Sequence, residues 1–134
     1  MAEIDWERRL REGIEAYNRG DWEAVLTDAS DDIELQRADI SPEARDIVRG
    51  RERVLEYFRP EVFEDQRIDL REIEIGDGAV YMSMRFSARG AGSGIPVEID
   101  SYAVYRIADD LLTRLEIYAD EPEARAAAGL TSPP

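Results

Sequence analysis

The sequence lacks cysteine, histidine and lysine altogether. Without cysteine there are no disulfides or thiolate nucleophiles, and without histidine there are no imidazole bases and no zinc sites of the usual ligand sets. All 17 basic residues are arginine, which stays protonated at ordinary pH and is therefore an anion binder but a poor proton shuttle. Any proton transfer would use carboxylates or tyrosines, and we expect neither a metal nor a cofactor.

Long apolar runs are also absent, since no stretch reaches the length of a signal-peptide core or a membrane span. We therefore expect a cytoplasmic protein. The 31 acidic residues outnumber the 17 basic ones, and the formal net charge of -14 repels nucleic-acid phosphates and anionic lipid. A role on nucleic acid or on a membrane is not expected.

The length of 134 residues predicts a single domain over residues 1–134, with a core over 4–130 and a loose tail over 131–134. Apolar residues at helical spacing, with capping residues beside them, predict four helices, over residues 6–20, 21–30, 51–63 and 121–129. Pro60 should end or kink the third helix. Strand patterns occur at residues 31–37, 67–75, 79–89, 95–107 and 111–120, with a loop over 38–50. Helices followed by an antiparallel meander indicate an α+β fold with helices packed on one face of a curved sheet.

Two short motifs lack the context that their chemistry needs. The loop GAGSG at residues 90–94 precedes a strand rather than the helix of a phosphate-binding loop, so a hairpin loop is expected. The Asp-Asp pairs at 31–32 and 109–110 lack the alternating ligands of a calcium loop and are interpreted as turn residues.

The stretch VEIDSYAVYRI, residues 97–107, carries a carboxylate, Asp100, at the centre of a predicted strand. Because strand side chains alternate between faces, Asp100 shares its face with Glu98 and Arg106, while Ile99 and Tyr105 lie on the apolar face. The helices should cover the apolar face, since burying several charges would cost several kcal/mol each. Asp100 is therefore predicted on the outer face; a bulge that turns it inward is the alternative.

The last predicted strand divides in the same way. Leu112, Arg114 and Glu116 fall on its outer face by alternation, opposite Leu115 and Ile117. Three arginines, Arg85, Arg106 and Arg114, are then available for cross-strand ion pairs with Asp100 and Glu116.

The order of four segments resembles the SnoaL-like branch of the nuclear-transport-factor-like superfamily over residues 4–130. These segments are YNRGDWEAVLTDASDDIEL, DIVRGRERVLEYF, YAVYRIADDLLTRLEIYAD and EPEARAAAGL. The resemblance implies a cone-like α+β barrel, in which N-terminal helices pack on a strongly curved mixed, mainly antiparallel sheet and enclose a pocket. It also implies a homodimer packed through the outer sheet face. Family members include polyketide cyclases, ketosteroid isomerase, scytalone dehydratase and limonene epoxide hydrolase, beside proteins without known activity.

The catalytic residues of these enzymes are missing at the matching positions. The isomerase's tyrosine, general base and oxyanion acid fall at Gly13, at Arg37 and near Ala103. The cyclases' aspartate–histidine pair is impossible without histidine, and the epoxide hydrolases' arginine falls at Glu98. Ile117 stands where many relatives place a glutamate.

The resemblance and the alternation together place ten residues in the pocket. Most of their side chains are apolar. The polar groups among them are two tyrosine hydroxyls, one serine hydroxyl and one arginine guanidinium. These ligand-binding candidates are Tyr17, Trp22, Arg37, Met82, Met84, Phe86, Ser101, Tyr105, Leu115 and Ile117. An alternative for Arg37 is a position at the pocket rim, paired with Asp39 or Asp120.

Three functions remain open on the sequence. The first is a pocket that binds a small apolar ligand, with an acidic group of that ligand held by Arg37. The second is a small hydrolase, isomerase or polyketide-cyclase-like enzyme, in which Asp100 or Asp120 transfers a proton and Arg37 or Tyr105 stabilises an anion. The third is a dimeric accessory domain that recruits a partner through the outer sheet face.

Overall fold

The computed structural model describes residues 4–38, 47–58 and 62–130. Its helices are α1 (Trp6–Arg19), α2 (Trp22–Val25), α3 (Arg51–Phe58) and α4 (Glu121–Ala127). Its strands are β1 (Ala29–Arg37), β2 (Ile47–Arg49), β3 (Phe63–Ile75), β4 (Ala79–Gly90), β5 (Pro96–Ala108) and β6 (Leu111–Tyr118). No helix within these ranges is long and apolar enough to cross a membrane.

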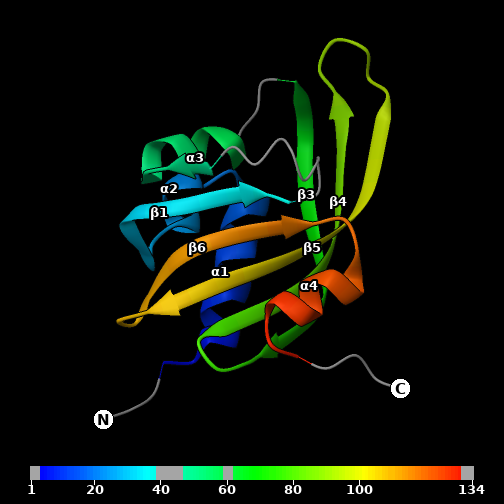
Figure 1. The fold of residues 1–134 in the computed structure, drawn as a ribbon. Coiled ribbons are helices and arrows are strands. Elements are labelled where there is room, and N and C mark those ends of the chain that lie inside the picture. The colour runs from blue at the N-terminus through cyan, green and yellow to red at the C-terminus, as the bar shows by residue number, and fades with distance from the viewer. Residues whose placement is uncertain (1–3, 39–46, 59–61, 131–134) are drawn as a thin grey trace.

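The strands form one mixed sheet in the order β2-β1-β6-β5-β4-β3. The β1–β6 pair is parallel and the other pairs are antiparallel. After β2 the chain forms α3 and then returns to the sheet as the antiparallel meander β3–β4–β5–β6, whose last strand lies beside β1. Figure 1 shows the sheet bending strongly between the long β3–β4–β5 hairpins and the β1–β6 end, with α1 behind it. The predicted α+β class is confirmed.

Helix α1 begins and ends where its capping residues predict. The Asp5 carboxylate accepts a hydrogen bond from the Arg8 N–H at 3.1 Å, and Gly20 takes the left-handed conformation at the C-terminus, with φ at 76°. The Asn18 side chain donates to the Ile68 carbonyl at 3.0 Å and accepts from the Ile68 N–H at 2.8 Å. This pair of hydrogen bonds fastens α1 to the edge strand β3.

Helix α4 covers part of the outer sheet face, opposite α1 (Figure 1). Tyr81 and Val104, which alternation places on the outer face, are fully buried in a second apolar cluster with Ala124. The Arg125 guanidinium lies over the Tyr81 ring, 5.1 Å from its centroid, and also pairs with Glu74 at 3.1 Å. Helices therefore pack on both faces of the sheet, whereas the strand alternation indicated a helical layer on one.

Three sequence predictions are corrected at the level of the strands. Residues 47–49 form β2, a strand inside the predicted loop, where Val48 pairs with Leu35. Strand β3 begins at Phe63, inside the range predicted for the third helix. The β5–β6 pairing shifts register between Arg106 and Ile107, so Leu112 is buried in the inner core rather than facing outward with Arg114.

Some predictions fall on residues outside the described ranges. These are the helix-ending role of Pro60, the pairing of Arg37 with Asp39, and the loose tail over 131–134.

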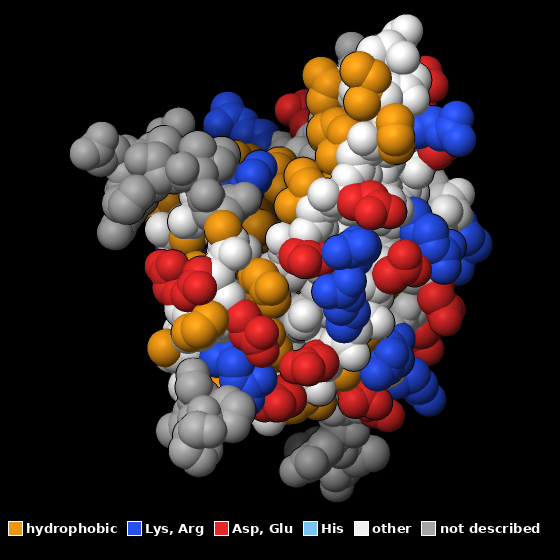
Figure 2. Space-filling model, turned by 90° about the vertical axis from the view of Figure 1, so that its right-hand side faces the viewer, with side chains coloured by type: hydrophobic (Ala, Val, Ile, Leu, Met, Phe, Trp, Pro, Cys, Tyr) orange, Lys and Arg blue, Asp and Glu red, His pale blue; other side chains and the backbone are white. Residues whose placement is uncertain are grey.

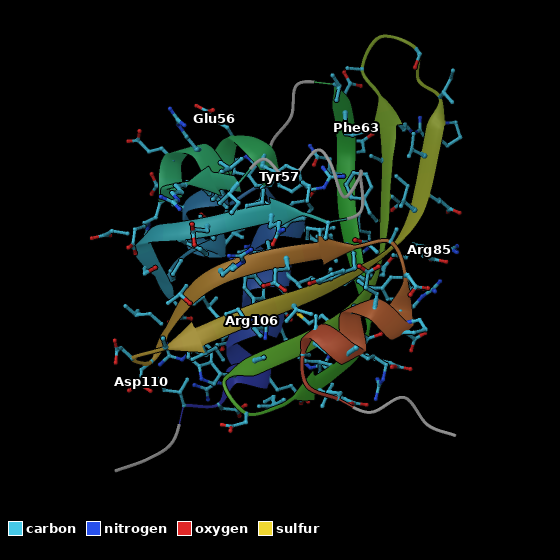
Figure 3. The ribbon with its side chains drawn as sticks, viewed as in Figure 1. Glu56, Tyr57, Phe63, Arg85, Arg106 and Asp110 are labelled. Atoms are coloured by element: carbon cyan, nitrogen blue, oxygen red, sulfur yellow. The ribbon has the colours of Figure 1, made fainter. Side chains whose placement is uncertain are left out.

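The outer face outside α4 carries cross-strand ion pairs, as predicted. The Arg85 Nε donates to the Asp100 Oδ1 at 3.1 Å, and an Arg71 nitrogen lies 3.2 Å from the same oxygen. Figure 3 shows Arg85 projecting away from the body of the molecule. The hydrogen bond from Arg85 is the main cause that holds the pKa of Asp100 below its ordinary value. The prediction that Asp100 faces outward is confirmed.

Glu116 makes the most buried of these pairs, with 5% of its surface exposed. Its carboxylate accepts two hydrogen bonds from Arg106, both at 3.1 Å, and one from the Tyr118 hydroxyl at 2.7 Å. Burial opposes ionisation of this carboxyl group, but the hydrogen bonds and the charges of Arg106 and Arg114 outweigh it. The pKa of Glu116 is therefore lower than the ordinary glutamate value.

Candidate functional site

A cavity of about 530 Å³ lies between the inner sheet face and the helices α1 and α3. Its lining is mostly apolar because strands β4, β5 and β6 present their apolar faces to it. Nine of the ten predicted residues line it. They are Tyr17, Arg37, Met82, Met84, Phe86, Ser101, Tyr105, Leu115 and Ile117.

Trp22 is the exception, and its prediction as a lining residue is wrong. It lies behind Tyr17, with the two ring centroids 5.2 Å apart in an edge-to-face contact. The helix α2 is a single turn, Trp22–Val25, so it presents Val25 and Ala24 to the cavity instead. Trp22 supports the wall without forming it.

Tyr17 lines the cavity, but its hydroxyl already has a partner. It donates a hydrogen bond to the Gln66 Oε1 at 2.5 Å, and its ring also packs edge-to-face on Phe58. Burial is the main cause that raises the pKa of Tyr17 well above its ordinary value, and the electrostatic effect of the neighbouring Tyr57 adds to it. Tyr17 is therefore a neutral wall residue that joins α1 to β3 and α3.

Tyr105 lines the cavity from the centre of β5 and differs from Tyr17 in one respect. Its side chain is buried, with 7% of the residue exposed, yet its hydroxyl makes no hydrogen bond to any residue in the described ranges. Burial alone raises the pKa of Tyr105, so the phenol stays protonated and remains a donor. A donor in the cavity lining without a partner among the described residues is available to an acceptor on a ligand.

Arg37 lies at the last position of β1, where it faces the cavity beside Tyr57 of α3. Its guanidinium lies over the Tyr57 ring, 5.0 Å from the centroid, which is a cation–π contact. Figure 3 shows Tyr57 on the side of α3 that faces the sheet. Asp120, the alternative partner, caps α4, where its carboxylate accepts a hydrogen bond from the Glu123 N–H at 3.0 Å.

An ion pair at the other end of β1 also lines the cavity and was missed in the sequence. Arg9 of α1 donates to the Asp28 carboxylate at 2.5 Å, and both residues contact the cavity. The Asp28 carbonyl accepts the Leu112 N–H at 2.8 Å, which places the pair beside the start of β6. Asp28 is the one carboxylate that lines the cavity among the described residues. Neither residue belongs to a motif, and no local pattern indicates their pairing.

Several other lining residues were also absent from the predicted set. Leu112 was assigned to the other face, and Phe63 and Gln66 lie where a helix or a loop was expected. The additional apolar lining residues include Ile14, Phe58, Phe63, Ile68, Ile99, Ala103 and Leu112. The period-2 pattern could have identified Ile99 and Ala103, because they share a face with Tyr105.

The carboxylates proposed for proton transfer do not reach the cavity. Asp100 is exposed on the outer face with Arg85, and Asp120 is exposed at the N-terminus of α4. The alternative in which Asp100 or Asp120 transfers a proton is not supported by this geometry, because a general base must lie within hydrogen-bond reach of the substrate.

Solved structures with the same fold are numerous and distant in sequence. An NTF2-like protein of unknown function from Burkholderia pseudomallei is 18% identical, with a TM-score of 0.74 over 92% of this chain and 97% of that chain. Rv0760c from Mycobacterium tuberculosis, in complex with estradiol-17beta-hemisuccinate, is 16% identical, with a TM-score of 0.71 over 85% and 92%. An LEH-like epoxide hydrolase of M. tuberculosis is 16% identical, with a TM-score of 0.66 over 84% of this chain and 80% of that chain.

No curated protein matches the sequence. The family comparison is decisive, because a model of the SnoaL-like domain matches residues 10–115, which is most of the chain. The chain belongs to the SnoaL-like domain family.

Proposed function

We propose that this chain binds a small, uncharged, largely apolar molecule that carries a carbonyl or a similar hydrogen-bond acceptor. The observation that carries the proposal is the Tyr105 hydroxyl, buried in an apolar cavity of about 530 Å³ without a hydrogen bond to the described chain. An apolar pocket with one placed donor binds by area and orients by the hydrogen bond. A ligand whose carbonyl accepts a hydrogen bond from this hydroxyl, and whose apolar body fills the cavity, would use both features.

The charges around the cavity favour a neutral ligand over an anion. The net charge of -14 repels anions at long range, and Arg9 is already paired with Asp28 inside the cavity. An acidic group held by Arg37, at the opposite end of β1, is the second binding mode to test. Rv0760c, which shares the fold, is in complex with estradiol-17beta-hemisuccinate. The apolar steroid body of that compound supports an apolar ligand here, and its free carboxylic acid supports the second binding mode.

The test compares matched ligands that differ only in the acceptor. Steroid-like, polyketide-like and fatty-acid-like compounds are first screened by thermal shift, and a ketone is then compared with its parent hydrocarbon by equilibrium dialysis. Wild type should bind the ketone about 2- to 12-fold more tightly than the hydrocarbon, the contribution of one hydrogen bond. Tyr105→Phe should abolish this preference, and Tyr118→Phe on the outer face is the matched control. A screen without any thermal shift would overturn the proposal.

An enzymatic reaction is the second candidate, and the position of Asp28 in the cavity favours it. A carboxylate there could remove a proton from the carbon next to a bound ketone's carbonyl, with Tyr105 as the donor to the oxygen. Proton–deuterium exchange of the bound ketone, followed by NMR in heavy water, tests this. Exchange that Asp28→Asn abolishes would establish catalysis, and exchange at the solvent rate would leave ligand binding as the function.

We also propose a homodimer through the outer sheet face, as the family resemblance implies. The exposed ion pairs of Arg85, Asp100 and Glu98 on this face are able to exchange with those of a second copy. Arg85→Glu should shift the sedimentation coefficient to that of a monomer, while Arg19→Glu on α1 should not. Sedimentation of the wild type as a monomer would contradict the dimer, and sedimentation of all three proteins as dimers would contradict this interface. The cytoplasmic location stays a prediction, which cell fractionation would test.

A further inference from the structure

Exposed apolar side chains gather beside the cavity at the end of the β4–β5 hairpin. Val62, Ile95 and Ile99 are 63%, 63% and 50% exposed, although this chain is 36% charged residues. The rings of Phe63 and Phe86 pack against each other here, with centroids 5.5 Å apart. We call these five residues the rim patch. Figure 2 shows hydrophobic side chains at the top of the projecting hairpin and along its side toward the body.

The rim patch is continuous with the cavity. Phe63, Phe86 and Ile99 belong to the patch and also line the cavity, so the two surfaces share these three residues. Backbone hydrogen bonds hold the other two in place: the Val62 carbonyl accepts the Ala91 N–H and the Ile95 carbonyl accepts the Gly90 N–H, each at 2.9 Å. The patch is an ordered extension of the cavity wall.

The distance along β5 sets the length of a ligand that could use both parts. Ile99 and Tyr105 lie on the same face of β5, six residues apart, which is about 20 Å along an extended strand. A compact ligand that meets the Tyr105 hydroxyl stays inside the cavity. A chain-like ligand that meets the same hydroxyl reaches the rim patch with its other end.

We propose that the ligand is a long-chain carbonyl compound, whose carbonyl meets Tyr105 in the cavity and whose apolar chain emerges over the rim patch. This inference rests on the proposed function and adds the class of ligand. The end of the chain covers the exposed face of Ile99, and an uncharged chain avoids the repulsion of the net charge of -14.

The experiment measures how affinity depends on chain length, with hexyl, decyl and tetradecyl methyl ketones in equilibrium dialysis. In wild type the tetradecyl ketone should bind about tenfold more tightly than the decyl ketone, because its last methylenes are partly buried on the patch. Ile99→Ser should reduce this ratio to about threefold or less. Ile75→Ser is the matched control, since Ile75 is 52% exposed on β3 and does not line the cavity.

The outcomes separate the two proposals. If no ketone of any length binds, both the proposed function and this inference are wrong. If hexyl methyl ketone binds but the length dependence is the same in wild type and the Ile99→Ser variant, only the rim patch inference is wrong. Self-association of the free protein that Ile95→Ser abolishes would assign the patch to a second copy and would also overturn the inference.

Discussion

Tyr17 and Tyr105 are the same residue type on opposite walls of one cavity, and their hydroxyls differ in what they contact. The Tyr17 hydroxyl donates to Gln66, whereas the Tyr105 hydroxyl has no partner in the described chain. Both are neutral because burial raises the pKa of each. Tyr17 therefore serves the fold, and Tyr105 is available to a ligand.

Removing each hydroxyl should separate these roles. Tyr17→Phe leaves Gln66 without its donor and should lower the free energy of unfolding by about 1 kcal/mol. Tyr105→Phe removes no hydrogen bond of the described chain and should change the free energy of unfolding by less than about 0.5 kcal/mol. Urea denaturation of the ligand-free proteins measures both. A loss above 1 kcal/mol for Tyr105→Phe would show that this hydroxyl stabilises the fold.

Glu116 should make the free energy of unfolding decrease at acid pH. The folded-state pKa of Glu116 lies below the unfolded value of about 4.3, so ionised Glu116 stabilises the fold above that pH. This stabilisation is lost as the pH falls through the lower, folded-state pKa. At neutral pH, Glu116→Gln should cost about 1–3 kcal/mol, because it removes hydrogen bonds between charged groups.

The pH series supplies the check on Glu116. Wild type and Glu116→Gln are unfolded in urea at several pH values, and their difference should shrink below about pH 4.3. Glu98→Gln, at an exposed position of the same sheet face, is the control and should show little difference at any pH. A constant difference for Glu116→Gln down to the acid transition would contradict the argument.

At the scale of elements, α1 carries a glycine in its interior that forms part of the cavity wall. Gly13 faces the cavity, and a Cβ atom added there would meet the Val25 carbonyl oxygen at 3.7 Å, an ordinary contact. Helical geometry therefore does not require glycine at this position. Its small size leaves space in the cavity.

Gly13→Ala should stabilise the fold and reduce the room for a ligand. The gain in the free energy of unfolding should be about 0.5–1 kcal/mol from helix propensity, and the thermal midpoint by calorimetry measures it. Gly20→Ala is the contrasting control, because φ at Gly20 is 76° and a side chain there should cost about 1 kcal/mol. Destabilisation by Gly13→Ala would mean that α1 cannot adjust to the extra methyl group.

At the scale of the whole molecule, the net charge of -14 competes with a surface rich in ion pairs. Exposed pairs such as Arg8–Glu12 and Arg67–Asp69 each contribute little to stability. The repulsion among the excess carboxylates acts over longer distances. Added salt should therefore reduce the repulsion more than it weakens the contact pairs.

Raising the salt concentration from about 0.01 M to about 0.15 M shortens the Debye length from about 30 Å to about 8 Å. The thermal midpoint should rise over this range, because the long-range repulsion is screened while pairs at 3–4 Å are screened less. Differential scanning calorimetry in sodium chloride measures it. A fall in the midpoint would show that the ion pairs contribute more to stability than the excess charge costs.

The sequence by itself determined the features that depend on local patterns. Period-2 alternation placed Met82, Tyr105 and Ile117 on the inner face and Asp100 on the outer face, because burying its charge would cost too much. Capping residues predicted both ends of α1. These features follow from neighbours in the chain, so one sequence was enough to infer them.

Only the tertiary structure decided the features that depend on distant contacts. The register shift between β5 and β6 moved Leu112 to the inner face, α4 buried Tyr81 on the outer face, and the fold paired Arg9 with Asp28. The tertiary structure also decided that the Tyr105 hydroxyl has no partner in the described chain, because this depends on every residue packed around it. Such contacts join segments that are far apart in sequence, and no periodicity within one segment encodes them.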